Sequence, residues 1–211
     1  MIKEESRFSE RPVFEGMTSV RAVINALENG TSDRRIIRVM CAQSRVAARG
    51  KELSYLKRCS EKLGFCVDTV SDDIIDAMTT GSTHGGIIAE CSARTIPHLA
   101  EAALPADGFY VMLEGIEDPY NFGYAVRSIY ASGADGIVLS PRNWMTAAGV
   151  VARASAGTSE MIPLYVCEPT DAAEIFKTSG YKIVSAGIRD SVSAYDADLK
   201  KPLLLIIGGE T

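Results

Sequence analysis

Residues 117–127 read EDPYNFGYAVR, and their place in the chain predicts where a ligand binds. They follow an apolar run, Phe109 to Leu113, that is typical of a buried strand. They also open a helix that we expect from about Phe122 to Ser132. A loop from a strand into the next helix lies at the carboxyl edge of an α/β sheet, where such folds bind their ligands. The stretch therefore predicts a ligand site at this edge.

Asn121, Gly123 and Arg127 are the residues of this stretch with suitable chemistry. Asn121 can cap the helix or donate an amide hydrogen bond, and Gly123 leaves room for a close approach. Arg127 lies about one and two-thirds helical turns after Asn121. By spacing alone, a helix cap followed by a salt-bridging arginine remains the simpler interpretation.

A resemblance to a known family changes this interpretation. Asn121, Gly123 and Arg127 give the pattern N-x-G-x-x-x-R, which resembles the first motif of the SpoU (TrmH-type) RNA methyltransferases of the SPOUT superfamily. VARASAG at residues 151–157 and LLIIGGE at residues 204–210 resemble the family's following motifs, in the same order. His84-Gly85-Gly86-Ile87 looks like part of its substrate-binding domain, which is similar to a ribosomal-protein fold.

The resemblance implies an enzyme that transfers a methyl group from S-adenosylmethionine to a ribose 2′-hydroxyl of rRNA or tRNA, and that acts as a homodimer without a metal. Arg127 would activate the hydroxyl, either as a base or by stabilising charge, with Asn121 and Glu210 completing the catalytic group. The residues expected to hold the cofactor are Ala186, Gly187, Gly208 and Gly209. The alternative is a non-catalytic RNA-binding module with a remnant SPOUT domain.

The order of expected elements divides the chain into an RNA-binding domain over residues 1–99, a linker over 100–108 and a methyltransferase domain over 109–211. The first domain alternates strands and helices, which predicts a small three-layer α/β fold. In the second, short apolar strands separated by helices predict a mostly parallel sheet covered on both faces. The family threads this part into a trefoil knot, an exception among folds. Because the sequence stops directly after Gly208-Gly209-Glu210-Thr211, we expect a truncated domain with an incomplete knot.

The expected elements follow from apolar periodicity and turn residues. The expected helices span residues 14–28, 50–63, 72–78, 122–132, 146–154 and 172–177. The expected strands span residues 34–42, 65–67, 85–91, 109–113, 136–139, 162–166, 182–186 and 203–207.

The net charge of −5 is unevenly distributed. Residues 1–100 carry 14 Lys and Arg against 13 Asp and Glu, whereas residues 101–211 carry 8 against 14. Residues 34–62 alone contain nine basic residues, opposed by Glu52 and Glu61. A basic segment in an acidic protein can neutralise RNA phosphates, although many charge runs are only solvated helix faces. The candidate RNA-binding residues are Arg34, Arg35, Arg38 and Arg45.

The five cysteines show no C-x-x-C spacing, and the chain has only two histidines, so we expect reduced thiols and no zinc site. The charged start, Met1-Ile2-Lys3-Glu4-Glu5, lacks the apolar core of a signal peptide. The longest apolar runs are too short to cross a bilayer. These features predict a cytoplasmic protein that does not enter membranes.

Overall fold

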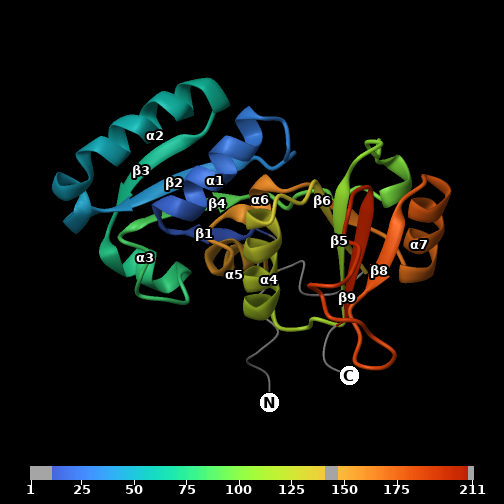
Figure 1. Cartoon of the computed structure of the whole chain (residues 1–211). Coiled ribbons are helices and arrows are strands. Elements are labelled where there is room, and N and C mark those ends of the chain that lie inside the picture. Colours follow the sequence, from blue (N-terminus) through green and yellow to red (C-terminus); the bar gives the residue numbers. More distant parts are fainter. Residues whose placement is uncertain (1–10, 141–146, 209–211) are drawn as a thin grey trace, which may run out of the picture. The chain divides into compact units, whose positions relative to one another are not determined.

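The computed structural model describes residues 11–140 and 147–208, and its internal contacts divide the chain into two units (Figure 1). Unit 1 comprises residues 1–95 and 144–161, and unit 2 comprises residues 96–143 and 162–211. A stretch from the second half of the chain therefore packs with the first half. The predicted α/β fold class is confirmed in both units.

Unit 1 is built on a four-stranded mixed sheet in the order β1-β4-β2-β3. Strands β2 and β3 are parallel, and β4 is antiparallel to both β1 and β2. The strands are β1 (Val13–Glu15), β2 (Ile36–Ala42), β3 (Cys66–Val70) and β4 (Ile87–Cys91). The helices are α1 (Gly16–Glu28), α2 (Gly50–Leu63) and α3 (Asp72–Met78), with the short turns η1 (Gln43–Arg45) and η2 (Ala47–Arg49) before α2.

Side chains alternate between the two faces of this sheet, as the pleat of a strand requires. Val39 and Cys41 of β2 belong to the core cluster that includes residues of α1 and α2. Their neighbours Met40 and Ala42 belong instead to the cluster around Ile75 of α3. Helices thus cover both faces, which confirms the predicted three layers.

The start of α1 corrects one expectation. Residues from Val13 to Glu15 form β1, so the helix begins at Gly16 and not at Phe14. Its N-cap is Glu15, which makes no side-chain capping bond. Gly16 has a φ of +81°, a backbone conformation that favours glycine and separates strand from helix.

The segment that returns to unit 1 contains α5 (Ala148–Ala154) and α6 (Thr158–Met161). Ala152 of α5 is fully buried in the core cluster of unit 1. Glu160 of α6 is also buried, and its carboxylate accepts hydrogen bonds from Arg34 Nε (2.8 Å) and Arg34 Nη2 (3.1 Å). Arg94 Nη1 lies 3.8 Å from the same carboxylate. The segment is therefore attached by apolar packing and by a buried charge cluster.

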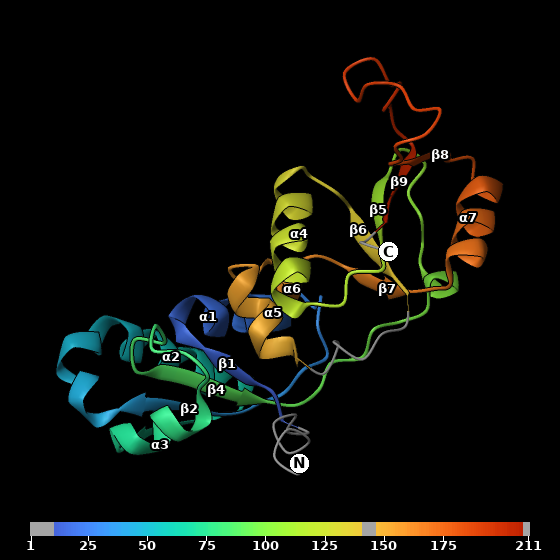
Figure 2. The same ribbon diagram turned by 90° about the horizontal axis from the view of Figure 1, so that it is seen from below.

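Unit 2 is a five-stranded, all-parallel sheet in the order β7-β6-β5-β9-β8. Figure 2 shows α4 and α7 on opposite sides of it, which confirms the predicted parallel sheet covered on both faces. The strands are β5 (Phe109–Glu114), β6 (Gly136–Leu139), β7 (Leu164–Val166), β8 (Lys182–Ser185) and β9 (Leu203–Gly208). The helices are α4 (Pro119–Ala131), α7 (Pro169–Thr178) and the short η3 (Leu99–Glu101).

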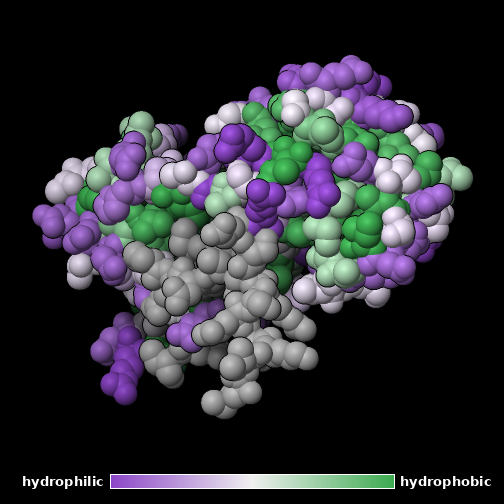
Figure 3. Space-filling model, turned by 180° about the vertical axis from the view of Figure 1, so that it is seen from behind, coloured by the Kyte–Doolittle hydropathy of each residue, from purple (hydrophilic) through white to green (hydrophobic). Residues whose placement is uncertain are grey.

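Hydrophilic and hydrophobic residues are interspersed over the surface that Figure 3 shows. The most exposed large apolar side chains lie between β8 and β9, where Ile188 is 98% and Tyr195 100% exposed. Among the described residues, no helix has the length and apolar character to span a membrane.

Candidate active site

The carboxyl edge of the unit 2 sheet gathers the predicted site residues of this unit. All five strands run in the same direction, so their carboxyl ends lie along one edge. From β5 the chain continues to β6 and β7 on one side of β5, whereas β9 and β8 lie on its other side. The direction of the strand order therefore reverses between β5 and β9. Such a reversal is where open parallel sheets bind ligands. Glu114 of β5 and Gly208 of β9 are partners in register at this point.

A polar pair that the sequence analysis missed lies at this edge. The Ser140 hydroxyl, directly after β6, donates a hydrogen bond to the Glu114 carboxylate at the end of β5. Ser140 is buried and Glu114 half-buried. In the sequence, both residues come immediately after apolar runs. This position could have marked them as candidates for the site. A carboxylate held here provides a fixed hydrogen-bond acceptor at the edge.

The N-terminus of α4 is capped by Asp118, whose carboxylate accepts a hydrogen bond of 2.8 Å from the Asn121 backbone N–H. Pro119 occupies the first turn, where its missing N–H costs nothing. The helix therefore begins earlier than expected, and Asn121 is not its cap. The Asn121 side chain is exposed and remains available to a ligand.

Arg127 lies on the exposed surface of α4. The structure gives its guanidinium no ion pair or hydrogen bond with any described residue, so the salt-bridge interpretation finds no support here. Arg127 lies six positions after Asn121 in the helix, which corresponds to about 9 Å along the axis and about 120° around it. Helix geometry therefore keeps the two side chains apart.

The predicted cofactor residues lie at the ends of β8 and β9. Ala186 N–H donates to the Ile206 carbonyl (2.9 Å), which continues the pairing of the two strands. Gly187 and Gly208 are exposed, and a Cβ on either would meet no heavy atom of residues 11–140 or 147–208 within 4 Å. The space beside their backbone is therefore open to a ligand. Gly209 and Glu210 lie outside the described residues.

The four predicted RNA-binding arginines differ in accessibility. Arg34 is 6% exposed and pairs with Glu160, so it is unavailable to RNA. Arg38 is half-buried and pairs with Glu90 at 2.8 Å. Arg35 and Arg45 are exposed. The charge pattern gave no sign of this difference, because the partner of Arg34 is 126 residues away in the sequence.

No group of three or more His, Cys, Asp or Glu side chains within residues 11–140 and 147–208 could hold a metal ion. All five cysteines are free, and only Cys66 is exposed. Burial raises the pKa of the Cys41 and Cys167 thiols, and that of Cys91 to about 12.

Comparison with known proteins identifies both halves of the chain. Residues 108–211 match the model of the SpoU rRNA Methylase family, and residues 20–97 match that for RNA 2′-O ribose methyltransferase substrate binding. The chain is 30% identical over 189 residues to the 23S rRNA (guanosine-2′-O-)-methyltransferase RlmB of Shewanella oneidensis, which covers 85% of this chain and 74% of that protein. It is also 30% identical over 197 residues to the putative TrmH family tRNA/rRNA methyltransferase YacO of Bacillus subtilis, with coverages of 90% and 76%.

Solved structures support the fold. An rRNA methyltransferase from Sinorhizobium meliloti superposes with a TM-score of 0.73 at 22% identity, covering 98% of this chain and 74% of that one. A second crystal structure, described as an RNA 2′-O ribose methyltransferase, gives a TM-score of 0.76 at 17% identity over 99% of this chain and 75% of the other.

Proposed function

Because this chain belongs to the SpoU family of RNA 2′-O-ribose methyltransferases, we propose that it transfers a methyl group from S-adenosylmethionine to a ribose 2′-hydroxyl of rRNA or tRNA. The observation that carries the proposal is the carboxyl edge of unit 2, where β5 and β9 meet beside α4. We also propose that the protein acts in the cytoplasm.

The residues at this edge fit S-adenosylmethionine. The open backbone at Gly187 and Gly208 gives the cofactor access, and Ala186 borders the same end of β8. Glu114, which accepts a hydrogen bond from Ser140, places a carboxylate at the same edge of the sheet. The cofactor supplies an electrophilic methyl group on a sulfonium centre. We assign Gly209 to the same backbone segment from its motif position.

The reacting 2′-hydroxyl is a weak nucleophile that develops negative charge on its oxygen as its proton leaves. Arg127 is exposed on α4 and has no partner among the described residues, so its guanidinium can bind that oxygen. An arginine is always protonated under ordinary conditions, which favours charge stabilisation over a base role. Asn121 would contact the ribose independently, because helix geometry separates it from Arg127. We assign Glu210 to the catalytic group from the family resemblance alone.

We also infer that two copies of the chain pair, because α4 presents an exposed aromatic face. Tyr120 is 44% and Tyr124 57% exposed, and the two lie one helical turn apart beside Arg127. Large exposed aromatic side chains are enriched at protein interfaces. Light scattering of wild type and Tyr124→Glu tests the pairing: a dimer that becomes a monomer supports it, and a monomeric wild type contradicts it.

Methyl transfer from labelled S-adenosylmethionine to unmodified rRNA and tRNA tests the function. The product is digested to nucleosides, which separates ribose from base methylation. Arg127→Ala should lower the rate about 100- to 1000-fold, as for loss of one oxyanion donor, with RNA binding unchanged. Arg58→Ala removes another exposed arginine, from α2, and should leave the rate as in wild type.

Two results would contradict the proposal. A methylated base as the only product would show another reaction. RNA binding without any heat of S-adenosylmethionine binding in calorimetry would favour the non-catalytic RNA-binding module.

Full activity of Arg127→Ala would remove that residue from the site. Arg127→Lys distinguishes its roles, because a lysine keeps the charge and should retain part of the activity only if Arg127 stabilises charge.

A further inference from the structure

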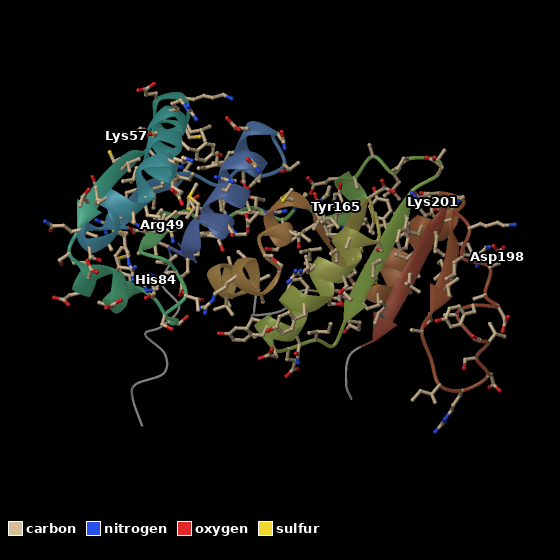
Figure 4. All side chains as sticks on the ribbon, turned by 60° about the vertical axis from the view of Figure 1, so that its left-hand side comes forward. Arg49, Lys57, His84, Tyr165, Asp198 and Lys201 are labelled. Atoms are coloured by element: carbon tan, nitrogen blue, oxygen red, sulfur yellow. The ribbon has the colours of Figure 1, made fainter. Side chains whose placement is uncertain are left out.

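A glycine-rich loop of unit 1, GSTHGG at residues 81–86, is packed against arginines from different elements. The end of the loop lies against Arg49 of η2, and Figure 4 shows His84 close to this arginine. The start of the loop lies against Arg153 of α5, whose guanidinium faces Gly81. The loop is therefore held at both ends, by arginines that are far apart in the sequence.

Arg153 comes from a segment that the family matches separate from the loop. The loop lies within residues 20–97, which match the substrate-binding model, whereas Arg153 lies within residues 108–211, which match the methylase model. In the structure α5 nevertheless belongs to unit 1, where Ala152 is fully buried in the core cluster. A helix of the methylase match therefore completes the unit that contains the substrate-binding match.

The Arg153 guanidinium connects two residues of the loop region. Its Nη2 donates a hydrogen bond to the Thr83 hydroxyl (2.8 Å), and its Nη1 donates to the Glu15 carboxylate (2.9 Å). The other oxygen of this carboxylate accepts hydrogen bonds from the backbone N–H (2.8 Å) and the hydroxyl (3.1 Å) of Thr80. Thr80 and Thr83 are thus fixed relative to each other through one guanidinium and one carboxylate.

Gly81 lies between these two threonines and allows the guanidinium to approach. A Cβ at this position would lie 2.0 Å from Arg153 Nη1 and 2.5 Å from Nη2, so any side chain would displace the arginine. A guanidinium is planar and holds its terminal nitrogens in a fixed fork. The geometry of Arg153 therefore sets the conformation of the chain from Thr80 to Thr83.

The same part of the loop borders two hollows in the surface of unit 1. The larger has a volume of about 520 Å³, and its lining includes Thr80, Gly81 and Ser82. The smaller has a volume of about 370 Å³, and its lining includes Thr83 and Arg153. Typical ligand pockets have volumes of roughly 300–1,000 Å³. The residues that Arg153 fixes therefore form part of the wall of a hollow of ligand size.

We propose that Arg153 is a positioning residue for the RNA substrate, which holds the loop from Thr80 to Thr83 in the conformation that binds RNA. Both terminal nitrogens of Arg153 are engaged within the protein, so it acts on the RNA through the loop. A loop that is already ordered loses less conformational entropy when it binds. The proposal rests on the proposed function, because it concerns the RNA to be methylated. It makes RNA affinity depend on α5, a helix outside the substrate-binding match.

Changes within the loop test the proposal, because Arg153 itself also holds α5. Thr83→Val removes the hydroxyl that Arg153 binds, at an exposed position and with little change in size. Fluorescence anisotropy with a labelled, mixed-sequence RNA of 20 nucleotides should show binding weakened about tenfold. Thr83→Ser keeps the hydroxyl and should bind as wild type does. In methyl transfer to unmodified rRNA, Thr83→Val should raise KM for the RNA and leave kcat and KM for S-adenosylmethionine unchanged.

Gly81→Ala disturbs the same contact by another route. The added methyl group displaces the Arg153 guanidinium, and Gly81 does not have the positive φ that would strain an alanine. This variant should weaken RNA binding as Thr83→Val does. Because both changes break one contact, the double variant should bind no more weakly than either single variant.

Thr31→Val is the matched control. It removes an exposed threonine hydroxyl that donates a hydrogen bond to the Ala26 carbonyl (3.2 Å). Thr31 follows the C-terminal end of the 13-residue helix α1, whereas the loop lies beside Gly16 at the N-terminal end, about 20 Å away along the helix. The control should bind RNA as wild type does.

Three results would overturn the proposal. These are RNA binding by Thr83→Val that equals that of Thr31→Val, a Thr83→Ser variant as weak as Thr83→Val, and losses that add in the double variant, which would indicate separate contacts. If Thr83→Val weakens RNA binding but wild type transfers no methyl group, the proposed function fails and the positioning role stands. If wild type methylates ribose and Thr83→Val has the same KM for RNA, the positioning role fails and the function stands.

Discussion

Replacement of Glu160 by glutamine should strongly destabilise unit 1. The Glu160 carboxylate binds two nitrogens of Arg34, at 2.8 and 3.1 Å, and Arg94 Nη1 lies 3.8 Å away. The three side chains are only 4–5% exposed, so water cannot replace the lost charge. Leaving buried cations without a counter-charge costs about 3–5 kcal/mol. This is a large part of the roughly 5–15 kcal/mol by which a typical protein is stable.

Urea unfolding followed by thiol labelling measures this effect within one unit. Cys91 is fully buried in unit 1, and Cys167 is almost fully buried in unit 2, so mass spectrometry of the labelled peptides reports each unit separately. With a slope near 2 kcal/mol per M, Glu160→Gln should lower the unfolding midpoint at Cys91 by about 1.5–2.5 M. The midpoint at Cys167 reports whether unit 2 keeps its own stability.

Glu28→Gln is the matched control, because it makes the same chemical change in an exposed pair. Glu28 and Lys62 are 2.9 Å apart, with side chains 31% and 66% exposed, and such pairs contribute about 0–1 kcal/mol. Arg34→Met combined with Glu160→Leu should recover part of the stability, because apolar replacements leave fewer buried charges. If Glu160→Gln lowers the Cys91 midpoint no more than Glu28→Gln does, the reasoning about the buried cluster is refuted.

Two further changes test the edge of unit 2 and the thiols. Gly208→Val should weaken S-adenosylmethionine binding at least tenfold in calorimetry without lowering the melting temperature, because an added Cβ would meet no heavy atom of the described residues within 4 Å. Gly50→Ala, also in open space, should leave cofactor binding unchanged, and equal binding by Gly208→Val would exclude the site there. Iodoacetamide at pH 8 should alkylate Cys66 alone in the folded chain, because burial raises the pKa of Cys91 to about 12; rapid alkylation of Cys91 would contradict its burial.

Local sequence patterns predicted most of the unit 2 sheet, because its strands are continuous apolar runs buried on both faces. The runs at Phe109–Leu113 and Leu203–Ile207 lie within β5 and β9. The strand Val13–Glu15 was missed, because three residues are too few to show an alternating pattern. The start of α4 was predicted too late, at about Phe122. An aspartate followed by proline, as at Asp118, can indicate either a turn or the capped start of a helix.

The candidate sites were less predictable, because they depend on contacts between distant residues. Arg34 appeared to be a solvated cation, and only the fold shows Glu160 beside it. The pairing of Glu114 with Ser140 follows from the parallel register of β5 and β6, which no single segment contains. The resemblance identified the His84 segment as part of a substrate-binding domain, but the arginines that face its glycines come from elsewhere in the chain.

Helices α5 and α6 pack in unit 1 although they lie between two strands of unit 2 in the sequence. The chain leaves unit 2 after β6 and returns to it at β7, and the intervening helices belong to unit 1 although the methylase family match includes them. The same segment carries Arg153, which holds the glycine-rich loop through Thr83, and Glu160, which neutralises Arg34. A change at Arg153 therefore disturbs the loop and the packing of α5 together, and its effect on RNA binding has no single cause. Arg45 forms no ion pair with a described residue and lacks this double role, whereas Arg49 also pairs with Glu52 of α2.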